Sequence, residues 1–151
     1  MVLELLSYIY NTFYRTVSTE SKFYYLSLIK TEDKWHIHGL WPQYDKKTYP
    51  KFCRNIPFDI TKLNSIINNL HDNWYSTKEK DSQFWEHEWN KHGTCMFNNQ
   101  PQMNELEYFS KTLELFNKVK DQNIIELYCT NQSKTKSMIP FDLNFNISND
   151  V

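Results

Sequence analysis

Hydrophobic and polar residues follow a two-residue period in the first part of the chain, which is typical of strands. Residues 22–29 are a dense run of aromatic and aliphatic side chains and predict a buried strand. After a charged turn, apolar residues alternate with His36 and His38, so a second strand would point both histidines to one face. We expect the Gly-Leu-Trp-Pro stretch at 39–42 to end this strand, because proline cannot donate to a ladder.

A period near 3.6 residues marks the helices. The helical segments are residues 1–17, a helix capped by Asp59 that reaches Leu70, residues 84–92, and residues 104–120. Gly93 is expected to end the third of them, as a glycine just past the last turn commonly does. Residues 124–129 predict a short strand, and weak alternation over 141–147 predicts an edge strand. Strands mixed with helices indicate an α+β domain.

Length and charge narrow the function classes. The 151 residues suit a single domain, and the formal net charge is −1, so phosphate recognition would depend on a few placed cations and histidines. No apolar run approaches the roughly twenty residues of a membrane helix. The apolar start lacks a basic region and a cleavage site, so we do not expect a working signal peptide. Three cysteines allow at most one bridge, which leaves the compartment undecided.

Four of the five histidines lie in two short segments, 36–38 and 87–92. At helical spacing, several polar residues of the second segment share one broad face with an aromatic ring. These residues are Phe84, His87, Glu88, Lys91 and His92. The plain alternative is that the histidines are partly buried polar residues and that Glu88 and His92 form an ordinary surface pair.

A metal site is the first functional alternative, because histidines on a strand and on a helix resemble zinc-ligand spacing. Its ligands would be His36, His38, His87 and His92. The helical histidines stand at i and i+5, whereas zinc-binding helices place them at i and i+4. The extra residue separates the two side chains by about 140° around the helix. This spacing argues against a metal.

Acid–base chemistry without a metal or cofactor is the second functional alternative. Two histidines from separate elements can catalyse attack of a ribose 2′-hydroxyl on the adjacent phosphorus, one taking a proton and the other giving one. Imidazole titrates near neutrality, so one ring can be neutral while the other is protonated. A lysine and a glutamate beside them can offset or share the charge that develops on phosphorus.

Two motifs then identify a family. His38-Gly-Leu-Trp-Pro42 and Phe84-Trp-Glu-His-Glu-Trp-Asn-Lys-His-Gly-Thr-Cys95 resemble, in the right order, the two active-site segments of the ribonuclease T2 family. Tyr49-Pro-Lys-Phe-Cys53 resembles a further element of that family. The resemblance covers about residues 22–130 of a single domain and implies a central antiparallel sheet with helices packed against it, here shortened.

The resemblance implies a role for each catalytic residue. His92 would take the 2′-hydroxyl proton and His38 would protonate the departing 5′ oxygen. His87 would contact phosphate, while Glu88 and Lys91 would stabilise the pentacoordinate transition state. The expected product is a 2′,3′-cyclic phosphate, formed without a metal.

It also implies how substrate is held. Trp41 and Tyr49 would stack on one base and Phe84 on the other, which suits single-stranded RNA because its bases are free to splay onto aromatic faces. Gln43 stands where an aspartate often follows the first motif. The resemblance therefore does not predict which base this site prefers. We expect a monomer. Relatives of this kind are mostly secreted or vacuolar.

Departures from the family pattern leave rival functions. Cys53 and Cys95 resemble a family disulfide pair, but the partner of Cys129 is absent, and residues 27–34 lack the usual Gln-Trp-Pro element and its cysteine. The rivals are therefore an RNA-binding or host-interacting protein of the same fold with little turnover, and a histidine-rich metal-binding hydrolase.

Overall fold

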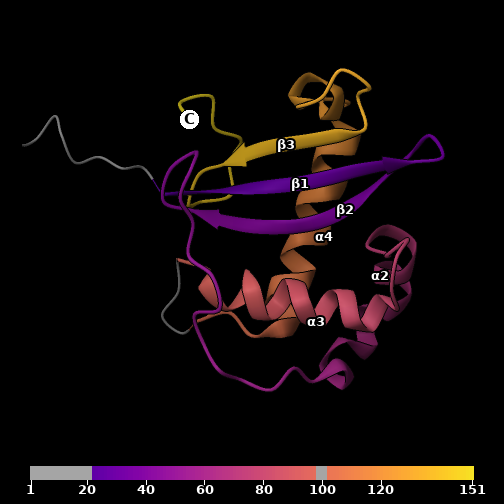
Figure 1. Ribbon diagram of the computed structural model, residues 1–151, viewed down its shortest axis with the longest axis vertical. Coiled ribbons are helices and arrows are strands. Elements are labelled where there is room, and N and C mark those ends of the chain that lie inside the picture. The colour runs from indigo at the N-terminus through magenta and orange to yellow at the C-terminus, as the bar shows by residue number, and fades with distance from the viewer. Residues whose placement is uncertain (1–21, 98–101) are drawn as a thin grey trace, which may run out of the picture.

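The computed structural model describes residues 22–97 and 102–151. The helix predicted over residues 1–17 lies outside them. The strands are β1 (Phe23–Thr31), β2 (Lys34–Gln43) and β3 (Lys136–Phe141), paired antiparallel in the order β2-β1-β3. The α-helices are α2 (Ile67–Asn73), α3 (Asp81–Lys91) and α4 (Glu105–Asp121). Figure 1 shows α4 crossing behind the strands, while α3 runs beside β2, so the α+β prediction is confirmed.

The first two strands form a tight hairpin. Glu32 and Asp33, between the strands, have φ values of 49° and 61°, as the two-residue turn that matches strand twist requires. The strand predicted over 22–29 is confirmed, but the expectation that residues 39–42 end the next strand is wrong, since β2 continues through Pro42 to Gln43. The sheet tolerates this proline because β2 is an edge strand, where a missing donor interrupts no inner ladder.

One irregularity interrupts the hairpin pairing. Ser27 pairs with Gly39, whereas Leu28 pairs with Ile37, so His38 is an extra residue in β2. Such a bulge bends the strand and re-aims the side chain of the inserted residue. The bulge thus falls on one of the two histidines expected to do chemistry.

The core lies between the sheet and α4. Tyr24, Leu26 and Leu28 alternate along β1 and are almost fully buried on the side that faces the helix. From α4, Tyr108 donates its hydroxyl hydrogen to the Leu40 carbonyl at 3.0 Å. Buried aromatic side chains provide much of this core because each removes a large apolar area from water. They are Trp74, Trp85, Trp89, Tyr108, Phe109 and Phe116.

Two predicted helix starts are confirmed by their caps. The Asp59 side chain accepts a hydrogen bond from the Thr61 amide, and a 3₁₀ helix, η1 (Ile60–Ile66), leads into α2. Asn104 begins α4 with a capping box, in which its side chain bonds the Glu107 amide and the Glu107 side chain bonds the Asn104 amide. These polar side chains satisfy amides that the helix itself leaves unpaired.

The C-terminal strand predictions are wrong in detail. Residues 124–129 contain a 3₁₀ helix, η3 (Ile125–Tyr128), in which Ile125 is buried while Leu127 is 78 % exposed. The strand of this region is β3, and the tail adds only an isolated bridge between Phe141 and Ile147. Among residues 22–97 and 102–151, no helix is both long and apolar enough to cross a lipid bilayer.

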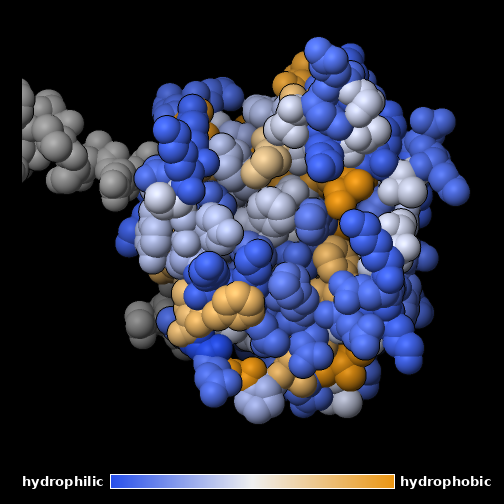
Figure 2. Space-filling model, viewed as in Figure 1, coloured by the Kyte–Doolittle hydropathy of each residue, from blue (hydrophilic) through white to orange (hydrophobic). Residues whose placement is uncertain are grey.

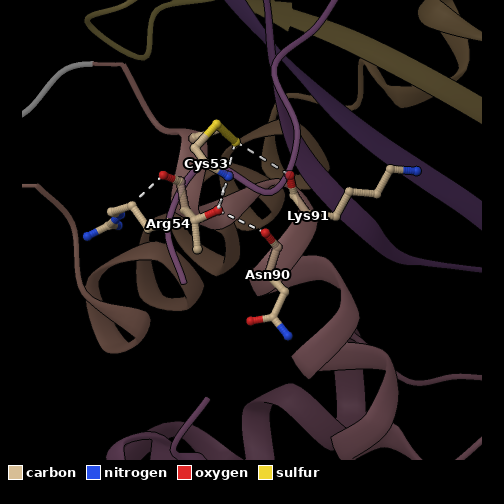
Figure 3. Close-up of a disulfide and its surroundings, with 6 residues drawn as sticks. Cys53, Arg54, Asn90 and Lys91 are labelled. Carbon is tan, nitrogen blue, oxygen red and sulfur yellow. Dashed lines mark hydrogen bonds between the residues drawn. A yellow bond between two sulfur atoms is a disulfide. The ribbon is translucent and has the colours of Figure 1, made fainter. Parts of the chain in front are cut away.

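A disulfide joins the loop after β2 to η2 (Gly93–Cys95), the short 3₁₀ helix that follows α3 (Figure 3). Cys53 and Cys95 are bonded, which confirms the expected pair, and the Cys53 amide donates to the Thr94 hydroxyl at 3.1 Å. Arg54 continues the attachment by donating to the Thr94 and Met103 carbonyls. The loop that carries Tyr49 is therefore fixed against the helix that carries most of the polar cluster.

We predict that this bridge contributes substantially to stability. Its cysteines are 42 residues apart in sequence, so the bond restricts a long stretch of the unfolded chain. Replacing Cys53 and Cys95 together by alanine should lower the free energy of unfolding by about 2–4 kcal/mol, as urea denaturation would measure. Cys129→Ala removes a thiol outside the bridge and should cost much less. Equal losses in the two variants would contradict this role.

Candidate active site

The helix α3 presents most of the polar cluster. It begins at Asp81, earlier than expected, and ends at Lys91, with His92 as its C-cap. Gly93 does not act as a left-handed C-terminal glycine, because no glycine among the described residues has a positive φ. A Cβ at Gly93 would instead overlap the Trp89 ring. The glycine is required by packing, and it allows the chain to turn directly after His92.

The predicted site residues lie together around two adjoining cavities. The first cavity, of about 230 Å³, is lined by His38, Trp41, Gln43, Tyr49, His87, Glu88, Lys91 and His92. The second, of about 250 Å³, shares His38, His87 and Glu88 with the first and adds Phe84. The expected aromatic residues are thus divided between two cavities that meet at these shared polar residues.

Sequence reasoning missed part of the second cavity. Its wall includes Tyr75 and residues 76–79, to which the sequence pattern assigns no role. It also includes His36, whose buried ring stacks on Tyr75 at 4.1 Å between centroids. His36 and His38 both line this cavity, although the bulge at His38 interrupts the alternation from which a shared face was predicted. No comparable periodicity exists in residues 76–79, which reach the cavity only because they lead into α3.

Glu88 is the most deeply buried ionisable group of the site. Its side chain is 2 % exposed, its Oε2 accepts a hydrogen bond from Trp41 Nε1 at 2.9 Å, and its Oε1 lies 3.6 Å from His38 Nε2. Burial raises the pKa of Glu88 to about 7, although the Trp41 hydrogen bond and the charge of Lys91 act in the opposite direction. This carboxyl therefore keeps its proton over much of the acidic range.

The two central histidines are shifted the other way. Burial, followed by the positive charge of Lys91, lowers the pKa of His92 to about 3. Burial, followed by nearby cationic groups including His36 and Lys136, lowers the pKa of His38 to about 4. Both rings are neutral near pH 6, so His38 meets Glu88 there as a neutral imidazole beside a carboxylic acid.

One nitrogen of His92 is the candidate proton acceptor. Its Nδ1 is buried and has no hydrogen-bond partner among the described residues. Because the ring still lines the first cavity, the other nitrogen, Nε2, is the one that can face a bound substrate. The ring stacks on Trp41 with 5.2 Å between centroids, which fixes its plane.

Positive charge lies at the opening of the first cavity. The Lys91 ammonium is 5.9 Å from the centre of the Tyr49 ring, and Tyr49 is 42 % exposed. His87, one turn earlier on α3, is exposed and lines both cavities. On the face drawn in Figure 2, hydrophilic side chains predominate, with smaller patches of paler and more apolar side chains among them. An anion in the first cavity would thus lie near Lys91 and His87 of α3 and near the rings of Trp41 and Tyr49.

The four histidines of the metal alternative are not arranged as one ligand set. His36 is engaged elsewhere, since its Nε2 lies 2.9 Å from the Thr31 hydroxyl. Across residues 22–97 and 102–151, no group of three or more histidine, cysteine, aspartate or glutamate side chains converges so that it could hold a metal ion.

Comparison with known proteins extends these observations to a family. The chain is 39 % identical over 95 residues to ribonuclease Oy of Magallana gigas, an alignment that covers 60 % of this chain and 45 % of that protein. It is 37 % identical over 94 residues to extracellular ribonuclease LE of Solanum lycopersicum, covering 60 % and 40 %. The chain therefore spans less than half the length of these curated relatives.

Solved structures show the same fold. Human RNase T2 superposes with a TM-score of 0.66 at 20 % identity, over 85 % of this chain and 90 % of that one. The sequence description of the ribonuclease T2 family matches residues 7–140. With its sheet, its disulfide and both motifs in place, this chain belongs to the ribonuclease T2 family.

Proposed function

We propose that this chain is an endoribonuclease that cleaves single-stranded RNA by transphosphorylation, without a metal, and leaves 2′,3′-cyclic phosphate ends. One observation carries the proposal: His38 from β2 and His92 from the end of α3 both contact the ring of Trp41 within one cavity. The centroid distances are 4.9 Å for His38, in an edge-on arrangement, and 5.2 Å for His92, in a stacked one. Two imidazoles from separate elements therefore face the same small volume.

His92 is the general base in this proposal. Its lowered pKa keeps the ring neutral above about pH 3, so Nε2 has a lone pair available for the 2′-hydroxyl proton. The deprotonated oxygen attacks the adjacent phosphorus, forming the new 2′ O–P bond as the 5′ O–P bond breaks. The stack on Trp41 and the hydrogen bond from the His92 amide to the Glu88 carbonyl hold the ring in position.

His38 is the general acid, and it needs a proton that its lowered pKa disfavours in the free protein. A bound phosphodiester supplies a negative charge nearby, which raises the pKa of an adjacent imidazole. Glu88, protonated below about pH 7 and 3.6 Å from His38 Nε2, is a nearby proton source. His38 then delivers its proton to the departing 5′ oxygen.

The remaining polar groups would stabilise the charge on phosphorus. Lys91 and His87 project from α3 into the first cavity and can donate to phosphoryl oxygens. After passing its proton to His38, the Glu88 carboxylate holds the imidazolium in place across the 3.6 Å contact and does not itself donate to phosphate. The charge that these groups meet is larger in the transition state than in the ground state, so their effect falls mainly on the rate.

Two cavities meeting at the catalytic groups suit two successive nucleotides. Trp41 and Tyr49 provide rings in the first cavity and Phe84 and Tyr75 in the second. Stacking on such rings requires bases that are not paired, which favours single-stranded RNA. Gln43 is buried in the wall of the first cavity, where its amide can both donate to and accept from a base edge.

The deciding experiment is cleavage of a mixed-sequence single-stranded RNA by the purified protein in excess EDTA, with analysis of the new ends. Cyclic phosphate ends in EDTA support the proposal, and a substrate with a 2′-deoxyribose before the scissile bond should resist cleavage. Activity that disappears with EDTA would favour a metal-dependent hydrolase. Retention of RNA without cleavage would favour a binding protein.

The two histidines give the sharpest mutational prediction. His38→Ala and His92→Ala should each lower kcat by about 10²- to 10⁴-fold, because each removes one proton-transfer group. His71→Ala is the matched control, since His71 is exposed, lies outside both cavities and bonds Asp81 at 2.6 Å. Rates would be measured on a dinucleoside monophosphate. A variant at position 38 or 92 that is as fast as the control would refute the assignment.

We predict that Glu88 lowers the free energy of unfolding at high pH, where its buried carboxyl is ionised. A raised pKa means that folding favours the protonated carboxyl, a contribution that is present below the usual pKa of 4.5 and lost as the pH rises through about 7. Glu88→Gln keeps the shape and removes the charge, so its stability relative to the natural protein should rise by about 2–3 kcal/mol between pH 4.5 and pH 8. Urea denaturation at both pH values measures this change.

The ionisable groups that do not contact Glu88 titrate alike in both proteins, so their contribution cancels from the difference. Glu86→Gln, at an exposed position of the same helix, controls for the loss of a surface charge. A Glu88→Gln effect that does not change with pH would show that burial does not hold the proton on this carboxyl.

A further inference from the structure

Trp41 contacts three of the groups to which the proposed function assigns chemistry. We propose that Trp41 is a positioning residue that acts through its indole N–H, holding the Glu88 carboxyl in the orientation that His38 requires. This inference rests on the proposed function and adds a role distinct from the stacking on a base that family resemblance implies for this residue.

The hydrogen bond from Trp41 distinguishes the two oxygens of Glu88. Nε1 donates to Oε2 at 2.9 Å, and the side chain of Glu88 is 2 % exposed, so no bulk water competes for this oxygen. Oε1 is thereby left toward His38 Nε2, at 3.6 Å. Without the indole N–H, the carboxyl could rotate about its last bond and present either oxygen to His38.

The backbone of β2 is shaped for this contact. A Cβ at Gly39 would overlap both Glu88 Oε2 and Trp41 Nε1, so the glycine leaves room for the donor and the acceptor to meet over the strand. Gly39 directly follows the bulge at His38 and comes two residues before Trp41. The imidazole, the glycine that leaves room for the carboxyl, and the indole therefore follow one another along β2. A residue that served only as a platform for a base would not require space at this point.

The ring itself keeps the two imidazoles apart. His92 stacks on Trp41 at an interplanar angle of 26°, while His38 meets it edge-on at 76°. The two imidazoles therefore already contact the indole ring before any substrate binds. Loss of the N–H alone should disturb Glu88, whereas loss of the whole ring should also disturb the spacing of the histidines.

The test separates positioning from binding through Trp41→Phe, which keeps an aromatic ring and removes the N–H. On a dinucleoside monophosphate, kcat should fall by about 10- to 100-fold, the range expected when a catalytic group is misplaced by about 1 Å, while KM changes less than about threefold. Trp35→Phe is the matched control, since Trp35 lies on the same strand outside both cavities. A rise in KM with kcat unchanged would overturn the proposal.

A double-variant cycle tests whether the effect passes through Glu88. In a Glu88→Ala background the acceptor is already absent, so adding Trp41→Phe should lower kcat by less than about threefold. An additional loss as large as that in the natural background would mean that Trp41 acts independently of Glu88, and would overturn the inference.

A spectroscopic measurement does not depend on activity. The assigned indole N–H signal of Trp41 in a ¹H–¹⁵N spectrum should move, and exchange faster with water, in Glu88→Ala but not in Glu86→Ala. If the protein does not cleave RNA, the proposed function fails, while this signal still decides whether Glu88 holds the indole N–H. A signal that Glu88→Ala leaves unchanged would overturn the inference.

Discussion

The contact that the site depends on is the one between the carboxyl of Glu88 and the strand residues directly opposite it. It connects α3, which carries most of the polar groups, to β2, which carries His38 and Trp41. The glycine at position 39 makes this approach possible, and the Trp41 indole satisfies one carboxyl oxygen. Because the carboxyl is almost inaccessible to water, its protonation state depends on protein groups and on burial.

Much of the scaffold followed from local signals. The cap at Asn104 and the apolar period behind it determine α4, and the dense apolar run of β1 determines the central strand. The two motif segments also identified most of the residues of the first cavity, because these side chains are grouped at one end of α3 and on one strand, whereas Tyr49 comes from the loop after β2. Where physical signals were local, sequence reasoning located the element and its buried face.

The predictions that differ from the structure share another cause. At these positions, packing between segments far apart in the sequence determined the conformation. Residues 124–129 are β-prone, yet they form a 3₁₀ turn that buries Ile125 and pair with β3 only through an isolated bridge from Cys129 to Ser137. Pro42 remains within a strand because that strand happens to be at an edge of the sheet. Tyr75 and residues 76–79 line a cavity only through the path that the chain takes into α3. In none of these three cases is the conformation determined by the intrinsic secondary-structure propensities of the residues alone.

The bulge in β2 has a consequence for how this hairpin can vary. Pairing on the turn side of His38 and pairing on its far side differ in phase by one residue, so the two halves of β2 obey separate registers. The tight turn at Glu32 and Asp33 dictates only the near half. The Gly-Leu-Trp-Pro half is aligned independently, by its pairing with β1 and by the groups that meet over Gly39. The hairpin end can therefore be shortened or rebuilt in evolution, or by design, while the Gly-Leu-Trp-Pro half keeps its place.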